Sequence, residues 1–537
     1  MPAAGAEAAT GPLPHDHFVN PVGEGADPYV VRDGDEYWWC WSDGDRGITV
    51  SRSTSLSSPG ARTLVWRAPA TGPCSAEVWA PELHRLDGRW HIYFAASDGD
   101  NRNHRAFVLV TETDDPAGPY RLHGPLATAD ADGPDRWAID MTILHHGGHR
   151  YAVWSGWPGA EETAQHLYLA RLDTPTEVGP RVLISSPFDH PWEAVPGSRP
   201  GHGPIAINEA PQVLQRDGRT FVLFSASGAW GPTYTMGALE LVGSDPAVAD
   251  AWRKHPAPVL APTPATPGVG HGLVVDGPDR APWLVFHAKI DHGPSFRRAV
   301  HVQPVTDPAA LPHLGVPLPA GRPVAVPSPV PQVSPPGDQR PGAQTDPVER
   351  SWDLRSAALP EGWEHFGHHQ FLVTRPDGLL LGRVPEEPVN AYRSGEKVIV
   401  TTTWCQDVAV TADLELLGAR GAAGVLLRAS GAAVGHDAFR GYFLGYDATH
   451  RRLVISRHDG VGAVVLAARP VRGRLRRSIG LQVTARGPVL SVRWTEDPQA
   501  APLEADDATF PAGAIGLRVD DTTARFTRLT CGRVRSG

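Results

Sequence analysis

The sequence is poor in cysteine, in methionine and in long apolar runs. Its 537 residues include four cysteines and three methionines. Four cysteines are too few for a disulfide-stabilised scaffold, and spacing alone leaves open whether Cys405 and Cys531 pair. No stretch approaches the ~20 consecutive apolar residues of a membrane-spanning helix, so no membrane association is expected.

Basic surface patterns and secretory-leader features are also missing. The formal net charge is -10 and no stripe of Lys and Arg stands out, which argues against nucleic-acid binding. The Ala- and Gly-rich start, residues 1–14, lacks the basic and apolar regions of a signal peptide. We therefore expect a cytoplasmic protein, or a secreted one whose leader is not part of this sequence.

Helix-type periodicity is scarce, and short strand-like runs take its place. Hydrophobic residues make up 41% of the chain and charged residues 20%, a balance typical of globular proteins. Runs of β-branched and aromatic residues alternate with Gly- and Pro-rich turns. We therefore predict an all-β protein, and its length indicates more than one domain.

A hairpin pattern recurs along the first part of the chain. In its clearest copy, Asp27 to Ser42, an apolar run leads through the turn Asp33-Gly34-Asp35 into an aromatic run. Further copies follow at spacings of about 50 to 70 residues, and they begin at Glu82, Asp140, Glu209 and His271. A small sheet built from one such repeat cannot bury both of its faces alone, so repeated sheets pack around a common axis. Five copies therefore predict a five-bladed β-propeller.

The first residue of each copy is polar and stands just ahead of a predicted strand. Equivalent places in a propeller converge on its central axis, so these residues are expected to line one central pocket. Four carboxylates and one imidazole gathered there would be costly unless a functional site uses them.

Composition divides the chain into four parts. They are a flexible tail at residues 1–15, the propeller at 16–320, a Pro-rich extended connector at 321–347 and a β-sandwich at 348–537. The tail runs into His15-Asp16-His17, which no further zinc-like ligands follow, so a solvated tail is favoured over a metal site. Ten short strand candidates lie between Val398 and Cys531.

Motifs across roughly residues 18 to 310 resemble those of glycoside hydrolase family 43. In chain order they are Ala26-Asp27-Pro28-Tyr29, Trp79-Ala80-Pro81-Glu82, Trp137-Ala138-Ile139-Asp140, Ile207-Asn208-Glu209-Ala210-Pro211 and Gly270-His271-Gly272. Each alone is weak evidence, but their order on five repeats is specific. Ala210 replaces a usual Gly and Met141 a frequent small residue; neither change removes a carboxyl group.

The resemblance implies an inverting glycosidase with Asp27 as general base, Glu209 as general acid and Asp140 as the residue that orients the acid and raises its pKa. Hydrolysis of a glycosidic bond needs one protonated carboxyl at the leaving oxygen and one carboxylate behind a water. A third carboxylate near the acid raises its pKa by like-charge repulsion. These requirements agree with the implied roles.

Other residues are expected to contact substrate: Trp79, Glu82, Ser155, Trp157, His271 and Arg298. The two tryptophans would stack on sugar, Glu82 would support the pocket wall, and Arg298 would hold a sugar hydroxyl. The blander alternatives are a core role for the tryptophans and a surface charge for Arg298. The resemblance places His271 at the axis beside a water or a cation, often calcium, while the chemistry itself requires no cofactor.

Details within the family look most like exo-acting arabinan-degrading members, which implies an α-L-arabinofuranosidase acting on a plant-type polysaccharide or oligosaccharide. The matching segments are Asp100 to Arg105, Ser155 to Gly159 and Ser225 to Gly228. Alternatives are a β-xylosidase with the same carboxyls and a non-catalytic carbohydrate-binding propeller. Loops closing the pocket would give exo action, and an open groove endo action.

The C-terminal region loosely resembles the concanavalin-like or laminin-G-like sandwiches that some of these propellers carry. The pattern rests on Trp352-Asp-Leu, on Gly424 to Ala429 and on Gly441 to Asp447. Such a domain would bind carbohydrate or brace the propeller. No surface aromatic platform stands out in its sequence, which favours bracing.

Overall fold

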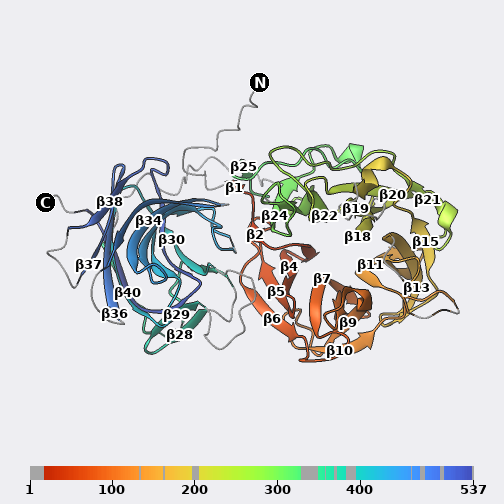
Figure 1. Cartoon of the computed structure of the whole chain (residues 1–537), viewed down its shortest axis with the longest axis horizontal. Coiled ribbons are helices and arrows are strands. Elements are labelled where there is room, and N and C mark those ends of the chain that lie inside the picture. Colours follow the sequence, from red (N-terminus) through yellow and green to blue (C-terminus); the bar gives the residue numbers. More distant parts are fainter. Residues whose placement is uncertain are drawn as a thin grey trace, which may run out of the picture.

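The computed structural model consists almost entirely of strands arranged in two domains (Figure 1). It describes residues 17–131, 133, 135–160, 164–195, 205–327, 349–356, 358–367, 372–382, 395–433, 435–460, 462–471, 478–495 and 501–534. The predicted tail at 1–15 and most of the predicted connector lie outside these ranges. None of the described segments is a helix with the length and apolarity that crossing a membrane requires.

Five sheets form the blades of the predicted propeller. The first contains β3 (Tyr29–Asp33), β4 (Glu36–Asp43), β5 (Gly47–Ser53) and β6 (Arg62–Arg67), and the second β7 (Ala76–Leu86), β8 (Arg89–Ser97), β9 (Arg105–Thr111) and β10 (Tyr120–Pro125). The third contains β11 (Ala138–His146), β12 (His149–Gly156), β13 (His166–Thr174), β14 (Glu177–Val178) and β15 (Val182–Ser185). The fourth contains β18 (Asn208–Arg216), β19 (Arg219–Ala226), β20 (Thr235–Leu241) and β21 (Trp252–Lys254).

The fifth blade closes the ring with a strand from the start of the chain. It contains β22 (Val269–Asp276), β23 (Pro282–Lys289), β24 (Arg298–Pro304) and, at its outer edge, β2 (Gly23–Glu24). Figure 1 shows β7, β11, β18 and β22 nearest the centre of the ring, with β6, β10 and β21 at its rim. The N-terminal segment therefore locks the last blade to the first.

The hairpin turns that the repeats predicted are present. In three blades the first two strands are joined by two residues that both have positive φ: Asp87-Gly88, Gly147-Gly148 and Asp217-Gly218. Two-residue turns of this kind match the twist of the strands that they join, and Asp and Gly tolerate the left-handed region. These turns set the register of the inner hairpins and hence the side chains that face the axis.

Short elements complete the propeller side. They are β1 (His17–Val19), β16 (Ala194–Val195), β17 (Ile205–Ala206), β25 (Pro323–Ala325), and 3-10 helices at Asn101–Asn103, Pro191–Glu193, Ala249–Ala251 and Pro308–Ala310. β1 pairs with β25, so the chain after the fifth blade lies against the propeller up to this point. This strand falls just beyond the predicted boundary at residue 320.

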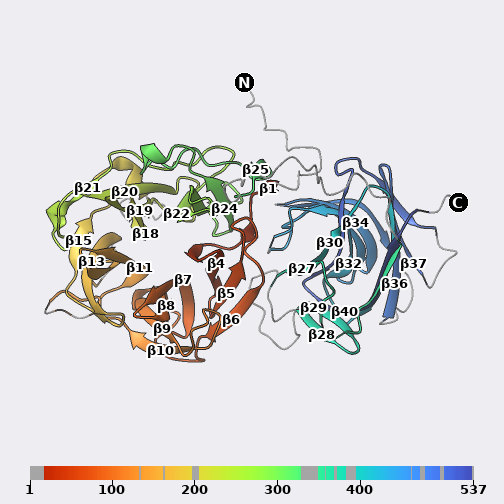
Figure 2. The ribbon, with the colours of Figure 1, turned by 180° about the vertical axis from the view of Figure 1, so that it is seen from behind.

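The C-terminal domain consists of two antiparallel sheets around one core (Figure 2). One contains β26 (Arg350–Asp353), β28 (Leu372–Arg375), β29 (Gly378–Gly382), β31 (Val408–Leu416), β36 (Ser478–Arg486), β37 (Val489–Trp494), β38 (Leu503–Asp506) and β40 (Thr523–Gly532). The other contains β27 (Trp363–Phe366), β30 (Lys397–Cys405), β32 (Ala422–Ser430), β33 (Arg440–Asp447), β34 (Arg452–Asp459), β35 (Ala463–Pro470) and β39 (Gly513–Asp520). Each of the ten strand candidates corresponds to one of these strands.

Polar contacts join the sandwich to the propeller near β2. The Arg62 backbone amide donates to the Gly367 carbonyl at 3.1 Å, and Arg440 Nη1 donates to the Gly321 carbonyl at 3.0 Å. The Glu24 side chain packs so closely on Gly435 that a Cβ there would lie 2.7 Å from its Cγ. The sandwich therefore touches the segment that leads into Asp27, as a bracing domain would.

Candidate active site

A bulge in the innermost strand of four blades turns selected side chains towards the axis. The strand register shifts between Ile139 and Thr142, between Glu209 and Gln212, and at the corresponding points of β7 and β22. Each bulge contains one residue with positive φ: Ala80, Asp140, Ala210 and His271. Asp27, directly ahead of β3, has φ of 51° and occupies the same place in the first blade.

This register corrects the expectation that all five first residues are equivalent. Asp27, Asp140 and His271 do share one position, but Glu209 lies one residue before it and Glu82 two residues after it. Except for Asp27, these residues lie inside strands and not ahead of them. The positive-φ residue lies seven residues before the first turn residue in the second, third and fourth blades, as Ala80, Asp140 and Ala210. The expectation chose the nearest acidic residue instead of this fixed position, and so misplaced Glu82 and Glu209.

Asp27 is surrounded by cationic and imidazole groups. Its Oδ1 lies 3.2 Å from Arg298 Nη1, 3.2 Å from His271 Nδ1 and 3.3 Å from His287 Nδ1. Burial alone would raise the pKa of Asp27, but Arg298 and His271 together hold it well below its ordinary value. Asp27 is therefore ionised at neutral pH.

The two histidines beside Asp27 differ in charge. Burial opposes protonation of both, yet the Asp27 and Asp140 carboxylates raise the pKa of His271 to about 9. His287 is fully buried near Arg298, and its pKa falls to about 3. The backbone amide of Asp27 donates a hydrogen bond at 3.0 Å to Nδ1 of the neutral His287, and this bond orients Asp27.

Glu209 has the opposite electrostatic setting. Burial and then the neighbouring Asp140 carboxylate raise its pKa to about 8, and a hydrogen bond from Tyr234 offsets part of that rise. Burial also raises the pKa of Asp140, to about 6, with His271 opposing and Asp27 adding to the effect. The site therefore holds one carboxyl that is protonated at neutral pH beside one that is ionised.

Glu82 belongs to a second layer of the axis. Its Oε2 lies 2.8 Å from His84 Nε2, and its Oε1 accepts a hydrogen bond from the side-chain amide of Gln212. His84 Nδ1 in turn lies 3.3 Å from the Tyr29 hydroxyl. With 1% of its surface exposed, Glu82 braces the inner strands rather than lining open space.

Trp157 and Ser155, two of the predicted substrate contacts, are buried in the structure. Trp157 is 1% exposed and stacks on Trp137 with ring centroids 4.7 Å apart. Ser155 is fully buried, and its hydroxyl donates to the Asn208 carbonyl at 2.9 Å. Neither side chain offers a free surface to a sugar, which argues for a supporting role. Trp79 is half-buried and stacks on His104 at 4.0 Å.

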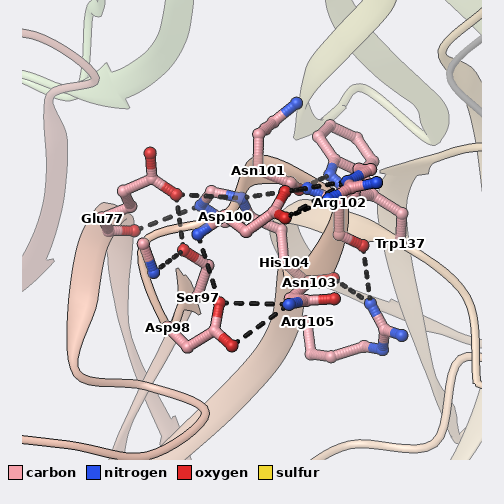
Figure 3. Close-up of polar contacts among 11 residues, drawn as sticks. Glu77, Ser97, Asp98, Asp100, Asn101, Arg102, Asn103, His104, Arg105 and Trp137 are labelled. Carbon is pink, nitrogen blue, oxygen red and sulfur yellow. Dashed lines mark hydrogen bonds and ion pairs between the residues drawn. The ribbon is translucent and has the colours of Figure 1, made fainter.

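The polar loop between β8 and β9 is held in place by its own side chains (Figure 3). The Asp98 carboxylate accepts a hydrogen bond from the Asn103 side-chain amide at 3.1 Å. Trp137 Nε1 donates to the Asn101 carbonyl at 2.7 Å, which ties the loop to the third blade. Figure 3 shows Glu77, Ser97 and His104 completing this network. The prediction that the loop faces substrate stays a prediction.

The axis shows no cluster of side chains typical of a metal site in the part of the chain that the structure describes. Within the described ranges, His, Cys, Asp and Glu side chains form no group of three or more arranged to hold a metal ion. Nδ1 of His271 is also engaged by Asp27. The prediction that His271 lies beside a cation therefore stays a prediction.

Sequence reasoning missed His287 and Tyr234. His287 ends the apolar run Trp283 to His287, and an ionisable residue closing such a run was the available signal. Tyr234 stacks on His287 with ring centroids 5.5 Å apart and lies beside Glu209. It sits at the start of a third strand, where nothing in the spacing marks it.

Comparisons with known proteins identify the family of the propeller. Residues 18–307 match the family model described as glycosyl hydrolases family 43. An extracellular exo-alpha-(1->5)-L-arabinofuranosidase of Streptomyces chartreusis is 34% identical over 296 residues, which is 53% of this chain and 85% of that protein. A protein of the same name from Streptomyces avermitilis is 32% identical over 293 residues, which is 52% of this chain but only 58% of that protein.

Solved structures agree as well. The alpha-L-arabinofuranosidase of Lactobacillus brevis is 28% identical, with a TM-score of 0.51 over 56% of this chain and 98% of its own. A xylan beta-1,4-xylosidase from Bacillus Halodurans C-125 shares the fold alone, at 16% identity and a TM-score of 0.51 over 96% of this chain and 100% of its own. The family model spans more than half of the residues, and this chain belongs to glycosyl hydrolases family 43 as a glycoside hydrolase.

Proposed function

We propose that the protein is an inverting exo-α-L-arabinofuranosidase that releases terminal arabinofuranose from arabinan or arabino-oligosaccharides. The observation that carries the proposal is the pair of carboxyls with opposite pKa shifts: the pKa of Asp27 lies far below its ordinary value and that of Glu209 rises to about 8. Such a pair supplies the base and the acid that glycoside hydrolysis needs. The names of the Streptomyces relatives support arabinofuranose as the sugar.

In this mechanism the terminal sugar lies between the two carboxyls. Asp27, ionised by Arg298 and His271, takes a proton from a water that attacks the anomeric carbon. Glu209, protonated because it is buried beside Asp140, donates its proton to the leaving glycosidic oxygen. Attack by water on the face opposite the leaving group inverts the anomeric configuration.

Asp140 acts through the backbone of the acid. Its Oδ2 accepts a hydrogen bond at 3.0 Å from the amide of Ala210, the residue after Glu209. It therefore fixes the position of the acid and keeps the pKa of that acid high through its own charge. His271 would lie beside an axial cation such as calcium, which the proposed chemistry does not require.

Export is the second part of the proposal. Both Streptomyces relatives are named extracellular, which favours the secreted alternative over the cytoplasmic one. A plant-type polysaccharide too large for uptake would then be accessible as substrate.

The test compares α-1,5-linked arabinobiose with β-1,4-linked xylobiose, two substrates whose leaving groups need protonation, in wild type, Glu209→Gln and Glu240→Gln. Glu240 lies in the same blade and pairs with Arg219 and Arg253, so its variant is the matched control. We expect arabinofuranoside turnover that falls by several orders of magnitude only in Glu209→Gln, and proton NMR should show the inverted anomer first. Preference for the xyloside would replace the sugar assignment. Turnover of neither glycoside, with sugar still bound, would indicate a non-catalytic binding propeller.

A further inference from the structure

Two aromatic side chains from neighbouring blades meet at the surface, away from the core clusters. Phe296, in the loop between β23 and β24, is 66% exposed. Its ring lies 6.1 Å from that of Trp230, in the loop between β19 and β20, with the planes inclined at 61°. A single exposed apolar side chain is ordinary, but Phe296 adjoins the partly exposed Trp230, and adjoining exposed apolar groups are candidates for a ligand-binding surface.

Both loops are built to hold these rings outward. Ser295 Oγ donates to the Asp291 carboxylate at 2.8 Å, and the Ser295 amide donates to the Trp230 carbonyl at 3.1 Å. A Cβ on Gly228 would lie 2.6 Å from the Trp230 ring, so any larger residue at position 228 would clash with that ring. The pair is therefore preorganised, and binding would cost little ordering entropy.

The aromatic pair is directly linked to the carboxyl site. The Arg298 guanidinium carbon lies 5.6 Å from the centre of the Phe296 ring. The same guanidinium donates through Nη1 to Asp27 Oδ1 at 3.2 Å. Arg298 therefore lies between Phe296 and Asp27, which places Phe296 at the rim of the site.

We propose that Trp230 and Phe296 form a binding subsite for the second sugar of the chain, the one linked to the terminal residue that is cleaved. The inference rests on the proposed function and adds a substrate contact that sequence reasoning did not identify. Sugar rings present C–H groups on one face, which pack on an aromatic face, and their hydroxyls stay in solvent at an exposed rim. Two rings are far too small for a stable protein interface of ~1,000 Å².

The experiment separates the second sugar from the first. Methyl α-L-arabinofuranoside has no second ring, whereas α-1,5-linked arabinobiose has one. Wild type, Phe296→Ala, Trp230→Ala and Phe296→Tyr are assayed for kcat/KM on both compounds. The control is Phe188→Ala, because Phe188 is equally exposed, at 65%, but contacts His166 instead of Arg298.

We expect Phe296→Ala to reduce kcat/KM for arabinobiose about tenfold, in line with the loss of roughly half of an aromatic burial. The methyl glycoside should change less than twofold, Phe296→Tyr should keep the wild-type ratio, and Phe188→Ala should leave both unchanged. An unchanged ratio in Phe296→Ala and Trp230→Ala would overturn the subsite while the proposed function stands.

Failure of the proposed function itself would be seen in the wild-type protein. If wild type cleaves neither arabinofuranoside, calorimetry with arabinotriose and xylotriose on wild type and Phe296→Ala decides the subsite. Weaker binding of either trisaccharide by the variant would support a sugar-binding aromatic pair, and equal binding would refute it.

Discussion

Asp140 Oδ2 accepts a hydrogen bond from the backbone amide of Ala210 at 3.0 Å, and thereby holds the residue that follows Glu209. Its negative charge also helps to raise the pKa of Glu209 to about 8. The two effects can be separated, since asparagine keeps an acceptor oxygen and loses the charge, whereas alanine loses both.

We predict that Asp140→Asn moves the alkaline limb of the pH–rate profile to lower pH. Without the neighbouring charge the pKa of Glu209 falls, so the acid loses its proton earlier as pH rises. Asp140→Ala should show the same shift and, in addition, a lower plateau rate because the acid is no longer oriented. A limb that stays in place in both variants would contradict the electrostatic role of Asp140.

The wild-type profile follows from the two carboxyls. In the proposed mechanism Glu209 must be protonated, so kcat/KM should fall about tenfold per pH unit once pH rises above about 8. Asp27 must be ionised, and because its pKa lies well below the ordinary value, the acidic limb should appear only at strongly acidic pH. Measurement of kcat/KM from acid to alkaline pH tests both limbs. An alkaline limb near the ordinary pKa of a glutamate would contradict the assignment of the acid.

Tyr234→Phe should move the alkaline limb in the other direction. The Tyr234 hydroxyl hydrogen-bonds Glu209 and lowers its pKa, so its removal raises that pKa. The variant also loses a stabilising bond to the carboxylate that forms during proton donation, a contribution of about 1.5–3 kcal/mol for a charged partner. Substrates with poor leaving groups should therefore slow tenfold or more, and those with good leaving groups much less.

A tyrosine elsewhere in the propeller gives the matched control. Tyr93 is buried, and its hydroxyl donates to the Pro175 carbonyl at 2.6 Å, away from the carboxyls. Tyr93→Phe should reduce stability slightly and leave the pH limbs unchanged. Equal effects of the two variants would mean that Tyr234 acts only through folding.

Ala210 carries backbone strain that a glycine would relieve. Its φ is 52°, a left-handed conformation that costs an L-residue roughly 1–2 kcal/mol. Ala210→Gly loses a buried methyl group but gains that relief. It should therefore reduce the free energy of unfolding by about 1 kcal/mol less than Ala152→Gly, an equally buried strand position without positive φ. Chemical denaturation measures both, and equal losses would contradict the strain.

Local chemistry explains what the sequence predicted well. Asp-Gly and Gly-Gly turns impose one hairpin geometry, and apolar alternation identifies the strands, so five blades and a second β domain could be inferred. Asp27, Asp140 and Glu209 converge as expected because they sit at the ends of these hairpins nearest the axis.

The remaining features depend on contacts between blades. The left-handed position of the bulge has no residue signature, because Ala, Asp and His all occupy it. Residue type therefore does not show that Glu209 lies one residue before this position. Tyr234 and His287 come from second and third strands, whose neighbours are set by ring closure and not by spacing. The aromatic pair of Trp230 and Phe296 likewise arises only when two loops of adjacent blades are brought together.

Ring closure by β2 has a consequence for the order of assembly. Gly23 pairs with Val300 and Glu24 with Ala299, so β2 cannot pair until β24 has been formed. Such distant pairing carries a large loop-closure cost and forms late in folding. Asp27 lies three residues after the end of β2, and its partner Arg298 begins β24. A chain that stops before β24 would therefore lack the Arg298 contact to Asp27, and we expect no glycosidase activity before β24 pairs with β2.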